Sequence, residues 1–252
     1  MNNKRLKTFN LILPFISIGT MLMFWAIASK VEDNVFILPS ISQTVESLFA
    51  LLKSKQFYHA ILTTFSRSVI AFAISFILAF CLAYLSVKSS VAKRLIEPII
   101  SITRALPTIA VVLLLLLWTN SQIAPVVVTT LVVLPTSYTN CYLAFSSLDK
   151  TVLDASMVDG ANKCSMFLFV EFPLIAPTFY STIGSGVSLN FKLMVAAEVI
   201  AQTARSIGYL LNTSKAYYET STMMALVLIS VIVGVIIEST FNAISKKAGD
   251  WR

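Results

Sequence analysis

Long apolar runs, several of them close to 20 residues, constrain this chain more than any other feature of its sequence. Residues 9–29 form the first such run, and others recur along the chain. About 20 apolar residues in a helix span the ~30 Å hydrocarbon core of a bilayer. The chain is 57% hydrophobic and 12% charged, whereas soluble domains carry about 25% charged residues. We therefore expect an all-α polytopic membrane protein, residues 1–252, folded as one domain.

Six membrane spans are expected from the apolar runs and the polar segments between them. They are assigned to residues 9–29, 67–87, 95–118, 123–145, 174–197 and 222–244. A cleaved signal peptide is the alternative for the first run, because residues 26–28 resemble a small-residue cleavage site. The run is longer than the 7–15 apolar residues usual in a signal peptide, so an uncleaved span is favoured.

An amphipathic pattern lies in the segment 30–66, between the first two spans. Val45, Leu48, Phe49 and Leu52 recur at spacings of three and four residues. This spacing places apolar side chains on one face of a helix, and such a helix can lie in a membrane interface. We therefore expect an interfacial helix here, and a polar loop over residues 201–221.

Basic residues gather on one side of the expected spans. The N-terminus, the loop 88–94, the segment 150–163 and the C-terminal tail together carry eleven of the nineteen Lys and Arg residues. The positive-inside rule therefore predicts that both termini, residues 1–8 and 245–252, are cytoplasmic, together with residues 146–173. The same rule predicts that residues 30–66 are external. It also explains the net charge of +7 without nucleic acid as a partner.

Polar residues and prolines inside the spans are candidates for a functional role. They are costly in lipid unless they face another helix or a water-filled path, and a proline in a span also bends the helix. The candidates are Pro107, Ser137, Asn140, Ser188, Asn190, Lys192 and Glu198. Two interpretations stay open, contacts between helices and the lining of a translocation path. For Glu198 we also weigh an ion pair with Lys192 or Arg205.

The polar segment between the fourth and fifth spans predicts a short surface helix. Thr151 and Asp154 fit a capping box at its start. Gly160 costs a helix about 1 kcal/mol relative to alanine, which favours a chain reversal or a close contact at this point. Pro173 and Pro177 lead into the fifth span. The segment is either an ordinary loop packed on its own bundle or a helix that docks on a partner.

The same segment resembles the cytoplasmic loop of permease subunits in ATP-binding-cassette (ABC) importers. That loop carries Glu-Ala-Ala, three residues, Gly, and further on an aliphatic residue and Pro. The residues that match it, and that the resemblance implies for ATPase coupling, are Asp154, Ala155, Ser156, Gly160, Ala161 and Pro173. Asp154 and Ser156 depart from the family residues but keep charge or small size.

Shorter stretches resemble the branch of these permeases that imports nitrate, sulfonates, taurine and related small organic solutes. The resemblance keeps its order from about residue 38 to residue 237. The matching stretches are residues 38–40, 59 with 64–69, 105–107, 195–198 and 206–209. It implies six membrane helices with a coupling helix between the fourth and fifth.

The resemblance also implies partners and a location. Two permease subunits, expected to be identical copies, form the path in the bilayer of a bacterial inner membrane. Two ATP-hydrolysing subunits dock on the cytoplasmic loops, and an extracytoplasmic binding protein delivers the solute. The sequence contains no G-x-x-x-x-G-K-[ST] motif, so this chain is expected to bind no cofactor and ATP is used by the partner.

Other functional classes have less support. A stand-alone secondary transporter or channel would use charges inside the membrane as ion sites, and Lys192 with Glu198 is its best candidate pair. A membrane-embedded enzyme would need a convergent set of His, Cys or carboxylate groups. The sequence has one histidine and shows no metal-ligand spacing, so we expect neither catalytic residues nor a metal site.

Overall fold

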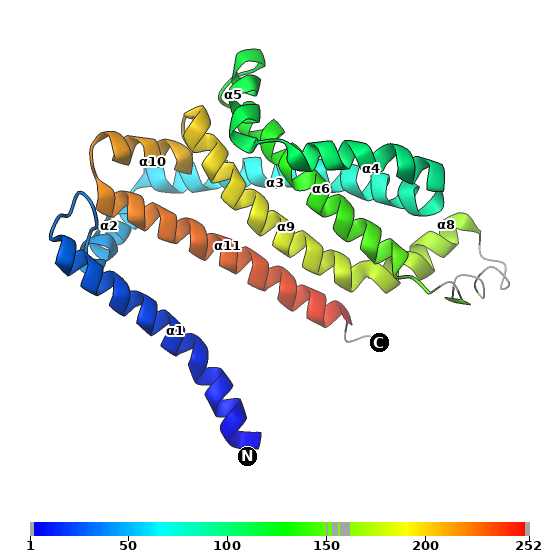
Figure 1. The fold of residues 1–252 in the computed structure, drawn as a ribbon, viewed down its shortest axis with the longest axis horizontal. Coiled ribbons are helices and arrows are strands. Elements are labelled where there is room, and N and C mark those ends of the chain that lie inside the picture. The colour runs from blue at the N-terminus through cyan, green and yellow to red at the C-terminus, as the bar shows by residue number, and fades with distance from the viewer. Residues whose placement is uncertain (1–2, 150, 153–155, 157–161, 250–252) are drawn as a thin grey trace. The chain divides into compact units, whose positions relative to one another are not determined.

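The computed structural model describes residues 3–149, 151–152, 156 and 162–249, and these residues form helices and connecting turns (Figure 1). They fall into two compact units. The first comprises Met1–Tyr58 and Leu210–Leu228, and the second His59–Tyr209 and Ile229–Arg252. The long helices α3 (Lys55–Lys88) and α11 (Thr220–Gly249) contribute residues to both units.

The first unit contains α1 (Asn3–Glu32) and α2 (Ile41–Lys53). Helix α2 confirms the helix that the amphipathic pattern predicts. Ser40 caps it, because its hydroxyl accepts the N–H of Gln43 while the Gln43 side chain accepts the N–H of Ser40. The turn before α2 is held by the Trp25 indole, which donates to the carbonyl of Pro39 at 3.1 Å.

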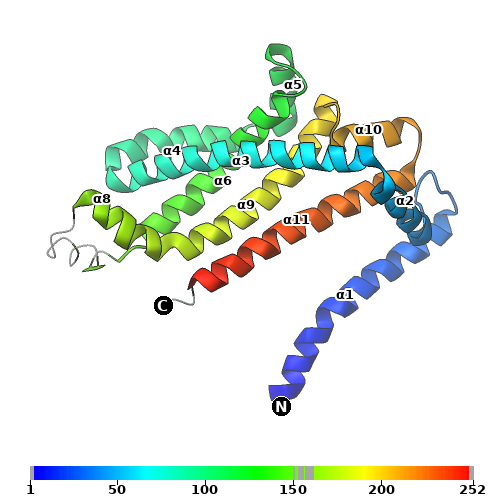
Figure 2. The ribbon, with the colours of Figure 1, turned by 180° about the vertical axis from the view of Figure 1, so that it is seen from behind.

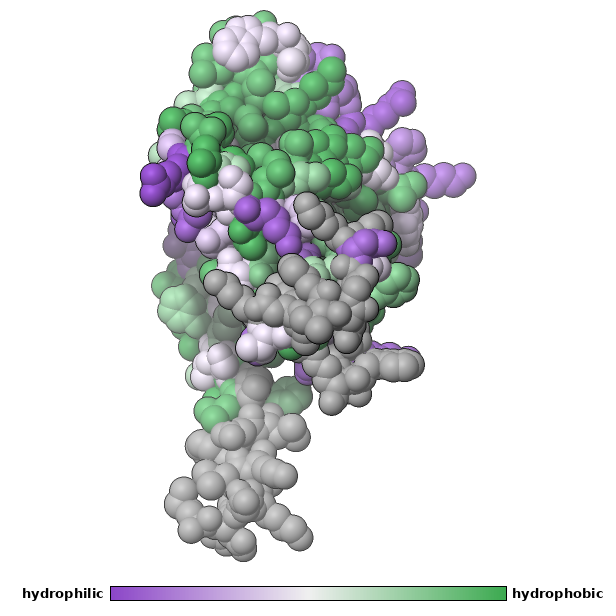
Figure 3. Space-filling view, turned by 90° about the vertical axis from the view of Figure 1, so that its right-hand side faces the viewer, coloured by the Kyte–Doolittle hydropathy of each residue, from purple (hydrophilic) through white to green (hydrophobic). Residues whose placement is uncertain are grey.

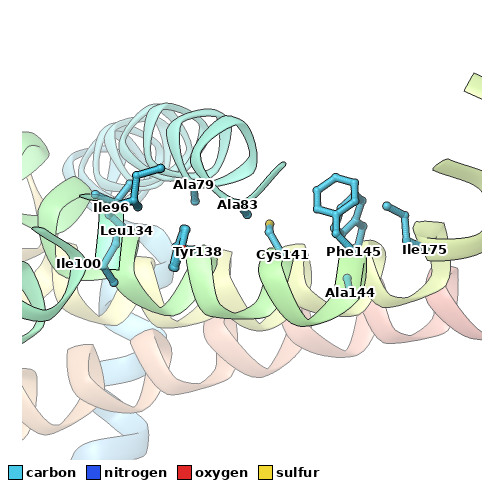
Figure 4. Close-up of a cluster of buried hydrophobic side chains, with 11 residues drawn as sticks. Ala79, Ala83, Ile96, Ile100, Leu134, Tyr138, Cys141, Ala144, Phe145 and Ile175 are labelled. Atoms are coloured by element: carbon cyan, nitrogen blue, oxygen red, sulfur yellow. The ribbon is translucent and has the colours of Figure 1, made fainter. Parts of the chain in front are cut away.

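The second unit is built around α6 (Ala124–Ser146) and α9 (Phe172–Ala201), which lie side by side (Figure 1). Helix α3 crosses both of them in the reverse view (Figure 2). Small residues let these helices approach closely. Figure 4 shows Ala79 and Ala83 of α3 against Tyr138 and Cys141 of α6, within a buried apolar cluster.

The expected third span is not one continuous helix, which corrects the prediction for residues 95–118. Helices α4 (Ser90–Ala105) and α5 (Thr108–Trp118) meet at a bend of 95°. Pro107 lacks an N–H group and disfavours helical backbone at the residue before it. Leu106 accordingly has a ψ of 127°, in the extended region.

Five helices of the described chain are long and apolar enough to cross a membrane, and six spans result if the α4–α5 pair counts as one. The polar loop expected at residues 201–221 is wrong in part, because α10 (Ile207–Ala216) lies within it. The Ser206 hydroxyl accepts the N–H of Tyr209 at 3.0 Å and caps this helix.

The exposed faces of α3 and α11 are largely apolar. Val69, Ile70 and Ile77 are exposed on α3, and Val231 and Ile232 on α11. Figure 3 shows apolar residues over much of the upper part of one view, with polar side chains towards its edges. Such faces are stable against lipid tails, because moving apolar side chains from water into hydrocarbon lowers the free energy.

Candidate functional site

Glu198, near the end of α9, forms a buried ion pair with Arg67 of α3. The Arg67 Nη1 atom donates to Glu198 Oε1 at 3.0 Å, and the Thr64 hydroxyl donates to Oε2 at 2.8 Å. The backbone N–H of Gly208 donates to the same carboxylate. A fully buried carboxylate is stable only with donors of this kind. The pairing of Glu198 with Lys192 or Arg205 that the sequence suggested is therefore wrong.

Further polar contacts fix the surroundings of the Arg67–Glu198 pair. The Thr64 hydroxyl accepts the N–H of Ile207 at 3.0 Å, and the second guanidinium nitrogen of Arg67 donates to the Gln122 side chain. A Cβ atom at Gly208 would lie 2.5 Å from the Glu198 Cβ and 2.6 Å from its carbonyl carbon. The pair thus ties α3 and α9 to the turn before α6 and to the start of α10.

A second ion pair joins the buried Glu171 to the half-exposed Lys88, the last residue of α3. The Lys88 ammonium donates to Glu171 Oε1 at 2.7 Å, while the other carboxylate oxygen has no hydrogen-bond partner. The Glu171 side chain is 3% exposed and that of Lys88 48% exposed. Glu171 is the last residue of a π-helical turn, η1 (Phe167–Glu171), directly before α9. Such turns occur frequently at functional sites.

The two ion pairs lie at opposite ends of α9, which runs antiparallel to α3. On α3, Lys88 is the last residue and Arg67 is twelve residues after the first. Arg67 and Lys88 are 21 residues apart on α3, about 32 Å at 1.5 Å per residue. This distance matches the ~30 Å thickness of a hydrocarbon core. Charged pairs at these two points therefore bracket the apolar part of the bundle.

Besides Glu198, three of the predicted path residues are buried within the second unit: Ser137, Ser188 and Asn190. The Asn190 amide donates to the carbonyl of Ser68 at 2.6 Å, so it ties α9 to α3. The Asn190 Oδ1 and Ser188 Oγ atoms have no hydrogen-bond partner. Asn140 is half-buried, and Pro107 is exposed at the α4–α5 bend.

Lys192 lies on an exposed face of α9 whose other polar members sequence reasoning missed. The exposed residues recur every three or four positions, at Thr178, Ser181, Ser185, Leu189, Lys192 and Ala196. The helical spacing of the three hydroxyl residues with Lys192 was a signal in the sequence. Which face of α9 is exposed depends on the packing of α3 and α6 and could not be read from that spacing.

Four of the predicted coupling residues, Asp154, Ala155, Gly160 and Ala161, lie outside the described residues. The Ser156 hydroxyl donates to the carbonyl of Val152 at 2.9 Å. Pro173 is exposed in the first turn of α9, directly after the π-helical turn η1.

Asp149 provides the capping oxygen that the sequence assigned to Thr151. The Asp149 carboxylate accepts the backbone N–H of Thr151 at 2.9 Å and the Thr151 hydroxyl at 2.8 Å. These two hydrogen bonds lower the pKa of the Asp149 carboxyl below its ordinary value, and the bond from the Thr151 backbone N–H has the larger effect. The expected role of Thr151 as N-cap is therefore wrong.

Comparisons with known proteins agree with this architecture. The family described as "Binding-protein-dependent transport system inner membrane component" matches residues 71–249. The chain is similar to a probable ABC transporter permease of Brucella abortus (25% identity, 86% of each chain). It is also similar to the taurine transport system permease of Escherichia coli (20% identity, 94% of this chain and 89% of that protein).

Among solved structures, the chain resembles one from inward-facing conformations of a methionine ABC transporter. The TM-score is 0.66, with 15% identity, over 75% of this chain and 94% of that one. At this identity the likeness establishes the fold. Both chains share the helical architecture of ABC transporter permeases.

Proposed function

We propose that this chain, which belongs to the family of binding-protein-dependent transport system inner membrane components, forms the membrane path of a small solute. It is a multi-pass ABC importer permease, a transport component rather than an enzyme. The observation that carries the proposal is the family match across residues 71–249. It covers α4, α5, α6 and α9 and the part of α3 from residue 71 onward, the helices that contribute to the second unit's core clusters.

The proposed assembly contains two permease subunits, expected to be identical, two ATPase subunits and an extracytoplasmic binding protein. ATP is used by the partner subunit in this proposal, since the sequence contains no G-x-x-x-x-G-K-[ST] motif. Both termini and residues 146–173 are proposed to be cytoplasmic, and residues 30–66 external. The distribution of Lys and Arg supports this orientation.

Coupling is proposed to run through residues 151–173. Gly160 is the proposed close-contact point, flanked by Asp154, Ala155, Ser156 and Ala161, and Pro173 begins the return to α9. The support from the structure lies at the end of this segment. The Lys88–Glu171 pair and the π-helical turn link the end of this segment to α3 and α9, so a displacement there would be passed to both helices.

The solute class is proposed from the relatives. One is a taurine permease and another a putative permease for aliphatic sulfonates. We propose a sulfonate-like or related small organic solute for this chain. The path candidates stay Pro107, Ser137, Asn140, Ser188, Asn190, Lys192 and Glu198, of which Lys192 lies exposed on α9.

Purification in mild detergent from the native membrane tests this proposal. The expected result is co-purification of a second polypeptide that carries the phosphate-binding motif and hydrolyses ATP. Purification of the chain alone, with transport driven by an ion gradient, would contradict the proposal and favour a stand-alone secondary transporter. A thermal-shift screen of the partner binding protein against taurine, alkanesulfonates and uncharged analogues would then identify the solute.

A further inference from the structure

The exposed face of α9 carries more polar residues than the largely apolar exposed faces of α3 and α11, although it also includes Leu189 and Ala196. Thr178, Ser181, Ser185 and Lys192 all lie on it, at helical spacing. Placing a lysine in the hydrocarbon core costs about 2.5–3.5 kcal/mol or more, and hydroxyl groups add to this cost. Contact with lipid is therefore unfavourable for this face of α9, whereas it is favourable for the exposed valines and isoleucines of α11.

Lys192 lies at the level of the middle of α11, on the exposed face of α9, and not at the end of a span. Its Cε atom lies 3.0 Å from the position of a Cβ on Gly234 of α11. Gly234 is 14 residues after Thr220 and 15 before Gly249, so it is about 21 Å along the helix from either end. The Lys192 ammonium is thus held near the middle of α11, where the absence of a Cβ on Gly234 leaves room for it.

A second polar group converges on the same point. The Ser188 hydroxyl lies 3.3 Å from the Cβ position of Gly234, and the Lys192 Nζ atom 3.9 Å from it. Ser188 is 1% exposed, and its oxygen has no hydrogen-bond partner. A buried hydroxyl without a partner costs about 1–3 kcal/mol unless something else completes its bonding. A buried donor beside an ammonium suits an anionic group.

No described ion pair engages Lys192, either with the acids at the ends of α9 or with Glu238, which is one turn after Gly234 on α11. The acids at the two ends of α9, Glu171 and Glu198, are bound by Lys88 and Arg67. Over the part of the chain that the structure describes, no carboxylate lies within ion-pair distance of the Lys192 ammonium. The exposed face of α9 thus carries a single positive charge and no negative charge.

We propose that this α9 face lines a water-filled path and that Lys192, with Ser188, is a subsite for the anionic group of the transported solute. The inference rests on the proposed function, in which the chain forms a solute path. It adds the residues of this chain that would meet the charged group of such a solute. Packing of the same face against a second copy of the chain is the alternative outcome of the test.

The accessibility of an introduced thiol in native membranes tests whether water reaches the exposed face of α9. Ser185→Cys would be introduced into a chain whose own cysteines, Cys81, Cys141 and Cys164, are replaced by serine or alanine. A water-soluble thiol reagent should label Ser185→Cys, because a thiol reacts as its thiolate and needs water to ionise. Ile232→Cys on the apolar face of α11 is the matched control and should stay unlabelled. Equal protection of both sites would overturn the proposal.

The charge preference is tested with two reagents of matched size, one bearing a sulfonate and the other a trimethylammonium group. With Lys192 present, Ser185→Cys should react faster with the anionic reagent. Lys192→Gln should lower the anion-to-cation rate ratio about fourfold, the effect of one charge about 10 Å away across water. Lys192→Arg should preserve the ratio. An unchanged ratio in Lys192→Gln would overturn the anion subsite.

These outcomes are separable from the fate of the proposed function. If no ATPase co-purifies with the chain while Ser185→Cys shows charge-selective labelling, the proposed importer assembly is wrong, but the proposal that the α9 face lines a water-filled path is supported. If the ATPase co-purifies and Ser185→Cys is protected, the function stands and the subsite is wrong. Labelling is measured in the intact membrane, so neither result depends on knowing the solute.

Discussion

The two ion pairs between α3 and α9 have the same chemistry and different surroundings. In the Arg67–Glu198 pair both carboxylate oxygens accept hydrogen bonds, and the carboxylate is fully buried. In the Lys88–Glu171 pair one carboxylate oxygen is unpartnered, and the lysine is half-exposed. A fully satisfied buried network is rigid, whereas a partly satisfied one is easier to rearrange.

The helices and turns around the two ion pairs also differ. The Arg67–Glu198 site is bonded to Ile207 through Thr64 and to Gln122 in the turn before α6, and Gly208 is in close contact with Glu198. The Lys88–Glu171 pair lies beside a π-helical turn and the segment that is proposed to meet the ATPase. One end of the α3–α9 pair is thus locked, and the other is placed where a partner can act on it.

The largest expected effect is the loss of Arg67. Arg67→Met leaves the Glu198 carboxylate buried without its cation, which should lower the unfolding free energy by about 3–5 kcal/mol. The measurement is the Tm of the purified protein in detergent. The double variant Arg67→Met with Glu198→Gln should recover much of the loss, because no unpaired charge is left. A double variant as unstable as the single one would contradict a locked ion pair.

A smaller effect is expected at Gly208. In Gly208→Ala the new methyl group would meet the Glu198 backbone at 2.6 Å, and overpacking of this kind costs about 1–3 kcal/mol. Gly234→Ala is the matched control, because its nearest contact is the flexible end of Lys192 at 3.0 Å. Similar Tm values for the two variants would show that the Arg67–Glu198 end is not tightly packed.

The smallest effect is expected at Lys88. Lys88→Met also removes the cation from a buried carboxylate, but the half-exposed lysine position lets water reach the pair. We expect a loss of about 1 kcal/mol, well below that of Arg67→Met. Lys88→Arg, which keeps the charge, should restore the Tm. A loss as large as that of Arg67→Met would remove the distinction between the two ends.

The helices were largely predictable because they depend on local sequence. The fourth expected span, residues 123–145, lies within one residue of α6 at each end, since its apolar run is bounded by polar turns. The α4–α5 bend was only half predictable. Pro107 signalled a bend, but the angle of 95° depends on how α5 packs against α6 and α9.

The ion pairs could not be predicted, because they join residues that are far apart in the sequence. Arg67 and Glu198 are 131 positions apart, and Lys88 and Glu171 are 83 apart. Their contact follows from the antiparallel packing of α3 and α9, and no local pattern encodes that packing. The sequence marks Glu198 as a candidate, whereas Arg67 appears in it only as the start of the second span and within the family-like stretch 64–69.

The proposal that the permease works through a partner ATPase bound at residues 151–173 is tested most directly by Gly160→Asp. The measurement is ATP hydrolysis by the reconstituted transporter on addition of the solute-loaded binding protein. We predict that Gly160→Asp reaches the membrane at the normal level and loses this stimulation, because a charged side chain enters the proposed contact. Stimulation equal to that of the unmodified chain would contradict the proposal.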